Sequence, residues 1–325
     1  MPQYKAIAIA RAGGPEVLTP VQRPRPEPGL GQVLIRVSTA GVNRHDCGQR
    51  SRGPNLHESD IPGLEVSGHI EQIGADVQGL QVEMPVCALV DGGGYGEFVI
   101  AEADNVLPVP EGMTLRDAAA IPEAAFTTWY NFFTLAAMQP HETVLIHGGT
   151  SGIGVFAIQM LRALGHPVYV TCGTDQKVDF ARSLGATDGF NYRTENFVKR
   201  MGDNNIVADV VLDMSGGIYT TQNLEVLAYG GRIVHLVSGA GAGLQVPLRA
   251  LMQKEARITG SFMRRLAQPR KAKVAQELKA HVWPLLGNKI RAIVSNAYPL
   301  DQAHLAHSCL EQGDNMGKLL LEVDA

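Results

Sequence analysis

One short stretch restricts the possible folds of this 325-residue chain more than any other. Residues 144–159 read VLIHGGTSGIGVFAIQ, in which an apolar run enters a cluster of glycines and a helical pattern begins at once. This order predicts a buried strand, a tight turn and a helix. Strand-like apolar runs and helical patterns then alternate toward residue 262. We therefore predict an α/β domain with a doubly wound parallel sheet that carries helices on both faces.

The glycines in this stretch have the spacing of the dinucleotide-binding fingerprint, with a small residue at its second position. Gly149 would allow the tight turn, Ser151 would let the backbone approach a pyrophosphate, and Gly154 would permit close packing of helix and strand. Backbone N–H groups and the positive end of the helix would then face the phosphates. The predicted pyrophosphate contacts are Gly149, Ser151, Gly152, Ile153 and Gly154.

The end of the next strand bears on whether the cofactor carries a 2′-phosphate. The segment VTCGTDQK places Gly173 at the strand end and Lys177 in the first helical turn. A small residue and a cation favour a 2′-phosphate, and hence NADPH. Asp175 leaves an alternative open, because a carboxylate can accept a hydrogen bond from a free ribose hydroxyl. Asp175 can also sit at the helix start, where negative charge is favourable, and Lys177 can be a solvated helix residue.

The first part of the chain has a different pattern. Up to about residue 120 the strand-like segments are short and broken by turns, with the Pro-rich RPRPEPG as a stiff connector. This pattern predicts a compact β-rich domain. A chain of 325 residues exceeds what one hydrophobic core usually supports, so two domains are expected.

Composition excludes several functional classes. A net charge of −4 gives no basis for binding nucleic acid or an anionic membrane, and no apolar run reaches the length of a membrane span. The N-terminal sequence lacks the apolar core and cleavage site of a signal peptide. We therefore expect a cytoplasmic protein, and its cysteines, which form no CxxC pair, are expected to be reduced. They are Cys47, Cys87, Cys172 and Cys309.

Motifs along the whole chain resemble those of one family. They read AGVNRHD, PGLEVSG, AAAIPEAAFTTWY, VLIHGGTSGIG, GTDQK and NMGKLLLEV, in that order. They are similar to the zinc-independent quinone oxidoreductases of the medium-chain dehydrogenase/reductase superfamily, where zeta-crystallin belongs, and more closely to the type induced by the tumour suppressor. The resemblance implies a GroES-like catalytic domain of residues 1–122 and 263–325 and a Rossmann domain of residues 123–262. It also implies a homodimer formed through the sheet edge near ARITGSF.

The zinc alcohol dehydrogenases of the same superfamily bind catalytic zinc through a Cys in GVC and a His in GHE. This chain has Asn43 and Leu64 at those places, and only Glu65 remains. A carboxylate without thiolate or imidazole partners is a poor zinc site, so we predict no metal. A rival site has no support from spacing; its members would be His45, Cys47, His57, His69 and Cys87.

The resemblance also assigns roles to individual residues. Asn43 takes the vacated ligand position, where its amide could donate a hydrogen bond to a substrate oxygen; a purely structural turn is the other interpretation. Thr127 matches the threonine beside the nicotinamide, with Thr128 as the alternative, and either hydroxyl could simply bond to the preceding helical turn. The remaining implied cofactor contacts are Gly173, Lys177, Tyr192, Ser238, Asn315 and Lys318.

These expectations define a reaction class. Quinones and conjugated carbonyls are already electrophilic, so hydride can add to them without a Lewis acid if the site aligns the reactants and stabilises the oxyanion. The alternatives are an enoyl-thioester or enone reductase, with Arg44, Arg50 and Arg52 near a carrier phosphate, and a non-catalytic NADPH-binding protein. The loop after Asn43 lacks the Tyr of several relatives, so Asn55 or His57 would cover the substrate or the pocket is open. No side chain is identified as proton donor, and solvent water is expected to fill that role.

Overall fold

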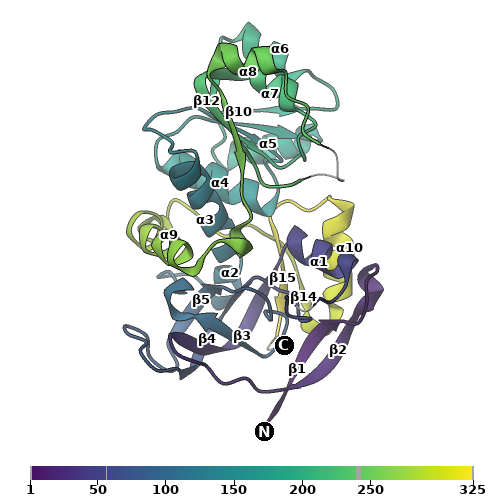
Figure 1. Cartoon of the computed structure of the whole chain (residues 1–325), viewed down its shortest axis with the longest axis vertical. Coiled ribbons are helices and arrows are strands. Elements are labelled where there is room, and N and C mark those ends of the chain that lie inside the picture. The colour runs from purple at the N-terminus through teal and green to yellow at the C-terminus, as the bar shows by residue number, and fades with distance from the viewer. Residues whose placement is uncertain (1, 56, 239–242, 324–325) are drawn as a thin grey trace. The chain divides into compact units, whose positions relative to one another are not determined.

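The computed structural model describes the chain except for residues 1, 56, 239–242, 324 and 325. It divides into two compact units (Figure 1). The first contains Met1–Phe126 and Ala267–Ala325, and the second contains Thr127–Leu266. Each junction lies four residues beyond the 122 and 262 that the family resemblance implies. Among the described residues, no helix is both long and apolar enough to cross a bilayer.

The second unit contains the predicted doubly wound sheet. Its six strands are ordered β10-β9-β8-β11-β12-β13, and every neighbouring pair is parallel. The order reverses at β8, which lies between β9 and β11, so the carboxyl ends of these strands form the switch point where such sheets bind ligands. The strands are β8 Val144–His147, β9 Val168–Cys172, β10 Asp188–Asn191, β11 Ala208–Asp213, β12 Leu227–His235 and β13 Arg257–Gly260.

The helices of this unit connect the strands, as parallel pairing requires. They are α4 Gly152–Ala163, α5 Asp175–Ser183, α6 Phe197–Asp203, α7 Thr220–Val226 and α8 Leu248–Lys254. Helix α3, Pro122–Trp129, leads into a π-helical segment at Tyr130–Leu135. β8 and β11 contain runs of fully buried Val, Leu and Ile, as expected for strands covered on both faces, and Asp213 at the end of β11 is fully buried as well.

The first unit is built on a sheet of seven strands. Its order is β14-β15-β3-β4-β5-β7, with β6 also paired to β3, and β1 and β2 form a separate antiparallel pair. The strands are β1 Gln3–Ile9, β2 Leu18–Pro24, β3 Gln32–Val42, β4 Glu65–Ile73, β5 Pro85–Leu89, β6 Phe98–Glu102, β7 Val106–Pro108, β14 Val294–Pro299 and β15 Lys318–Glu322. Its helices are α1 Arg44–Arg52, α2 Leu115–Ala118, α9 Gln268–His281 and α10 Ala303–Gln312.

The register of this sheet brings the end of the chain beside its beginning. β15 pairs antiparallel with β3, and Leu319 lies opposite Val42. β3 pairs in turn with β4, and Ala40 lies opposite Val66. The end of β3 and the starts of β4 and β15 therefore meet at one edge of the sheet.

Candidate functional site

The glycine turn forms the expected link between β8 and α4. Ser151 caps the helix, and its hydroxyl accepts a hydrogen bond from the Gly154 N–H at 3.0 Å and donates one to the Gly148 carbonyl at 2.8 Å. The positive end of α4 thus opens directly after the strand. This turn could hold an anionic group by its backbone N–H groups.

Three glycines of the turn have different structural tasks. Gly148 takes the left-handed conformation, with φ of 87°. The tight turn therefore depends on Gly148, whereas the fingerprint had assigned it to Gly149. A Cβ on Gly149 would lie 2.6 Å from Cβ of Val170 in the neighbouring strand. A Cβ on Gly154 would lie 2.4 Å from the Gly148 carbonyl oxygen. Gly154 therefore permits the close packing predicted for it.

Gly173 and Tyr192 meet at the end of the next strand. Gly173 follows β9, and a Cβ there would lie 2.7 Å from the Tyr192 hydroxyl oxygen, so a larger residue would require this exposed ring to move. Thr174 caps α5 and accepts a hydrogen bond from the Lys177 N–H at 3.2 Å. Asp175 is the first residue of that helix, where its negative charge is favourable, which was one of the two interpretations of this residue.

The charge of Lys177 acts on the strand end beside Gly173. Burial raises the pKa of the Cys172 thiol to about 11, and Lys177 is among the groups that oppose this shift. The ammonium group is thus close enough to act electrostatically on the end of β9. Ser238 is exposed and lies three residues beyond the end of β12.

Thr127 and Thr128 are both buried in α3. The Thr128 hydroxyl donates to the sulfur of Met160 at 3.7 Å. The carbonyl of Thr127 accepts a hydrogen bond from the Asn131 amide at 2.7 Å, in the π-helical segment that follows. Such segments are frequent at functional sites, and Thr127 stays the predicted member of the pair.

In the first unit, the half-buried Asn43 and the buried Glu65 and Lys318 form a polar group. Asn43 follows β3, Glu65 opens β4 and Lys318 opens β15. The Lys318 ammonium donates to Asn43 Oδ1 at 2.6 Å and also contacts Glu65 Oε1. The Asn43 amide nitrogen donates to the same Glu65 oxygen at 2.9 Å. Glu65 is fully buried and Lys318 is 4% exposed.

These contacts fix the Asn43 amide in one orientation. The ammonium group can only donate, and an ionised carboxylate can only accept, so the amide oxygen must face Lys318 and the amide nitrogen must face Glu65. One N–H of Asn43 remains for another acceptor. The other oxygen of Glu65 accepts from the Glu123 backbone N–H at 2.8 Å, which holds the carboxylate in place. Gly41 lies so close that a Cβ there would be 2.3 Å from Glu65 Oε1.

The sequence pattern did not predict this group. Lys318 was predicted to contact the cofactor, and within its own unit its ammonium group contacts Asn43 and Glu65. The retention of Glu65 without zinc ligands was a usable signal, because a buried carboxylate requires a cation. Asn315, also a predicted cofactor contact, donates its amide N–H to the Gly317 carbonyl at 2.8 Å.

The donor set of this group does not fit zinc. An amide and an ammonium group replace the thiolate and imidazole that zinc prefers, and the carboxylate already has its cation. Within the described parts of the chain, no group of three or more His, Cys, Asp or Glu side chains is arranged so that it could hold a metal ion. The rival set around Cys47 and Cys87 is therefore not assembled there, and burial raises the pKa of the Cys47 thiol to about 12.

A second buried network supports the start of α1. Asp46 is fully buried and accepts hydrogen bonds from the Asn43 N–H at 2.8 Å, the Tyr95 hydroxyl at 3.0 Å and the Gly63 N–H at 3.3 Å. The Tyr95 hydroxyl also contacts a nitrogen of His307 at 3.0 Å. Asp46 thereby positions the backbone of Asn43 through the helix cap.

Arg50 belongs to the same network. Its guanidinium is 3% exposed, donates to the Gly13 carbonyl at 3.1 Å and pairs with Glu311 at 2.6 Å. Arg50 is therefore not available to a carrier phosphate, although the enoyl-thioester alternative placed it there. The other two arginines of that alternative, Arg44 and Arg52, are exposed.

Asp46 makes stability depend on pH. Burial raises its pKa to about 6, against about 3.9 in an unfolded chain. The folded state therefore binds this proton more tightly, and the associated stability is present below about pH 4 and is lost as the pH rises through 6. The unfolding free energy of the wild type minus that of Asp46→Asn should fall by about 2–3 kcal/mol between pH 4 and 7 in urea titrations. A pH-independent difference would contradict the assignment.

Comparison with known proteins agrees with this architecture. Residues 29–111 match the alcohol dehydrogenase GroES-like domain family, and residues 152–280 match the zinc-binding dehydrogenase family. The chain is 31% identical to the quinone oxidoreductase of Mus musculus, over 98% of this chain and 97% of that protein.

Solved structures agree as well. The quinone oxidoreductase of Escherichia coli, solved in complex with NADPH, has a TM-score of 0.85 and 27% identity, covering 98% of this chain and 100% of that one. The quinone oxidoreductase of Thermus thermophilus, also solved with NADPH, has a TM-score of 0.82 and 30% identity over the same shares. The chain therefore belongs to the quinone oxidoreductase branch of the medium-chain dehydrogenase/reductase superfamily, with a GroES-like domain and a Rossmann domain.

Proposed function

We propose that this protein is an NADPH-dependent reductase that transfers hydride to quinones or related conjugated carbonyls without a metal ion. The observation that carries the proposal is the Asn43–Lys318–Glu65 group, which takes the place of a zinc ligand set. The NADPH bound to the Escherichia coli and Thermus thermophilus relatives supports the choice of cofactor.

The turn after β8 and the ends of β9 and β10 supply the residues that would hold NADPH. Close backbone packing at Gly149 and Gly154 leaves the end of α4 open to the pyrophosphate. Gly173 and Tyr192 would border the adenosine ribose, and Lys177 would face its phosphate. Thr127 and Ser238 are proposed beside the nicotinamide. When bound, NADPH supplies the hydride.

Asn43 would act on the substrate oxygen. Its remaining N–H can donate to the oxygen that gains negative charge as hydride adds to a conjugated ring. Lys318 and Glu65 hold the amide in this orientation, so the donor needs no reorganisation during the reaction. Lys318 also places a positive charge one hydrogen bond behind the donor. Protonation of the product is assigned to solvent water.

We further propose a homodimer formed through β13. This strand is the outer strand of its sheet, and such edges present unpaired N–H and C=O groups. Large exposed apolar residues accompany it in α8 and in the segment after the strand: Leu248, Met252 and Phe262. Sedimentation should give twice the 34.9 kDa of one chain, and Phe262→Glu should shift the protein toward the monomer. A monomeric wild type at micromolar concentration would contradict this proposal.

The proposed location is the cytoplasm, in keeping with thiols that remain reduced. Cys47, Cys87, Cys172 and Cys309 are all free in the structure. Disulfides are rare in that compartment.

The reaction class is tested by the initial rate of NADPH oxidation with ortho-quinones, para-quinones and crotonyl thioester, with NADH as a parallel donor. Each assay is repeated after dialysis against EDTA. We expect turnover of quinones with NADPH that is insensitive to EDTA. Turnover of the thioester alone would replace the proposal by enoyl reduction, and NADPH binding without any turnover would support a binding protein.

A further inference from the structure

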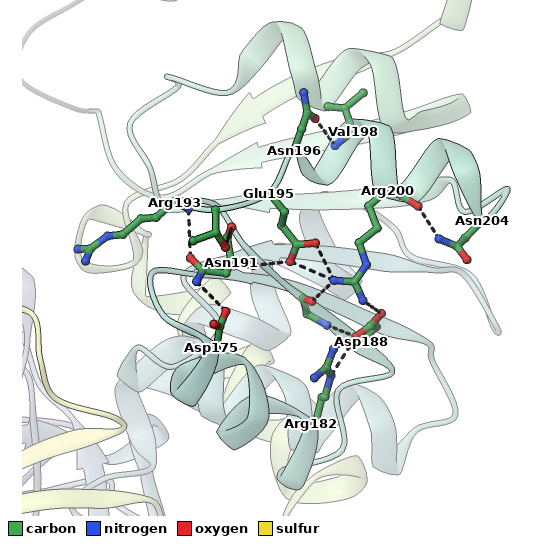
Figure 2. Close-up of polar contacts among 12 residues, drawn as sticks. Asp175, Arg182, Asp188, Asn191, Arg193, Glu195, Asn196, Val198, Arg200 and Asn204 are labelled. Carbon is green, nitrogen blue, oxygen red and sulfur yellow. Dashed lines mark hydrogen bonds and ion pairs between the residues drawn. The ribbon is translucent and has the colours of Figure 1, made fainter.

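Asn191, the last residue of β10, lies at the centre of a polar network at one edge of the parallel sheet (Figure 2). It is 5% exposed and pairs with Cys172 of β9. Its side-chain oxygen accepts a hydrogen bond from the Arg193 backbone N–H at 3.1 Å, and its amide nitrogen donates to Asp175 Oδ1 at 2.7 Å. A backbone N–H can only donate and a carboxylate only accept, so the amide has one possible orientation.

Ion pairs hold the turn that follows Asn191. The Asn191 backbone N–H donates to Glu195 at 2.8 Å, and Arg200 binds Glu195 at 2.7 Å and Asp188 at 2.8 Å. Arg182 binds the other oxygen of Asp188 at 2.6 Å. The network therefore neutralises Arg182 and Arg200, and it fixes the backbone of residues 191–195 against the sheet (Figure 2).

Asp175 opens α5 two residues beyond Gly173, so its carboxylate is near enough to the end of β9 to compete for the free ribose hydroxyl that an acidic side chain binds in related folds. Here the Asn191 amide holds that carboxylate at the end of β10, as Figure 2 shows. A carboxylate facing the ribose would attract the hydroxyl of NADH and repel the phosphate of NADPH. The hydrogen bond to Asn191 thus withdraws a carboxylate that would favour the unphosphorylated cofactor.

Arg193 is the cation that the same turn presents. A Cβ built on Gly173 would lie 3.6 Å from Arg193 Nε and 2.7 Å from the Tyr192 hydroxyl oxygen, so both side chains border this glycine. Arg193 is exposed and has no ion-pair partner among the residues that the structure describes. A guanidinium group in this setting matches the geometry and charge of a phosphate.

We propose that Asn191 is the positioning residue that sets the preference for NADPH over NADH. It does so by holding the Asp175 carboxylate away from the ribose and by fixing the turn that presents Arg193. This inference rests on the proposed function, since it concerns the 2′-phosphate of the proposed cofactor. Lys177 and Tyr192 were already predicted to contact the cofactor. The inference adds Arg193 as a further contact of the phosphate and Asn191 as the residue that positions it.

The test compares the dissociation constants of NADPH and NADH by fluorescence titration. Asn191→Leu keeps the side-chain size and removes both amide contacts. We expect the preference for NADPH to fall by about ten- to a hundredfold, the range set by a charge-assisted hydrogen bond gained or lost. The double variant Asn191→Leu/Asp175→Asn should regain at least half of the lost preference for NADPH, on a logarithmic scale. The side chain at position 175, released from Asn191, then carries no charge that could repel the phosphate. Arg193→Gln should weaken NADPH and 2′,5′-ADP binding and leave NADH unchanged.

Asn196→Leu is the matched control. Asn196 caps α6 in the same region and accepts a hydrogen bond from the Val198 N–H (Figure 2). It also accepts one from the Lys199 N–H. Its loss should cost about 1 kcal/mol of stability without changing the ratio of the two constants. A wild-type ratio in Asn191→Leu, or no recovery in the double variant, would overturn the inference. Failure of the proposed function would show differently, as a wild-type protein that binds neither dinucleotide.

Discussion

Replacement of Lys318 by methionine is expected to lower the free energy of unfolding by about 3–5 kcal/mol. Methionine replaces the apolar part of the lysine side chain but removes the cation from Glu65, whose carboxylate is fully buried. Without the ammonium group, the carboxylate keeps its hydrogen bonds from Asn43 and Glu123 but has no opposite charge to offset its lost hydration. Urea unfolding, followed by circular dichroism, measures the effect.

Two further variants separate this cause from a general loss of packing. Lys318→Met/Glu65→Gln removes both charges and should recover at least half of the lost stability. Lys273→Met is the matched surface control, because Lys273 pairs with Glu277 on the exposed face of α9 and is 71% exposed. Its effect should stay within about 0.5 kcal/mol. If Lys318→Met cost no more than this control, the buried ion pair would not have the role assigned to it.

Substitution of Gly154 by alanine is expected to weaken NADPH binding by at least about a hundredfold, equivalent to about 2.7 kcal/mol. The added Cβ would lie 2.4 Å from the Gly148 carbonyl oxygen and 2.6 Å from that of Gly149. The two peptides must shift, and they belong to the turn proposed to face the pyrophosphate. Fluorescence titration with NADPH measures the loss, on protein whose circular dichroism confirms the fold.

Gly202→Ala is the control for this substitution. Gly202 lies in α6, and a Cβ there would meet no atom within 4 Å. Alanine should leave NADPH binding unchanged and raise stability by up to about 1 kcal/mol, since glycine is unfavourable in a helix. Equal affinities for Gly154→Ala and Gly202→Ala would show that the close approach at Gly154 has no bearing on cofactor binding.

The Rossmann domain could be predicted from sequence because its signals are local. The strand, the turn and the helix of residues 144–159 are consecutive, and the parallel sheet follows from repeated strand–helix alternation. The sequence could not show which glycine of the turn takes positive φ. Gly148 does so, and Gly149 is required for contact with Val170 of the next strand, which is a tertiary constraint.

The polar groups of the site depend on pairings between distant segments. Lys318 and Asn43 are 275 residues apart and meet only through the register of β15 on β3. The contact of Asn191 with Asp175 likewise requires β10 to lie beside β9. Antiparallel pairings of the first domain are not encoded by periodicity, because many strand orders satisfy the same alternation. The motifs therefore singled out Asn43 and Lys318 but could not predict the contacts that these residues make with each other and with Glu65.

The most direct test of a metal-free reaction at Asn43 is the single-turnover rate of NADPH oxidation by a quinone in stopped flow. It compares wild-type protein before and after dialysis against EDTA with the Asn43→Ala variant. The account predicts the same rate for both wild-type samples and a rate about a hundredfold lower for Asn43→Ala, the loss expected for one oxyanion donor. A rate that EDTA abolishes and zinc restores, or an Asn43→Ala variant as fast as wild type, would contradict it.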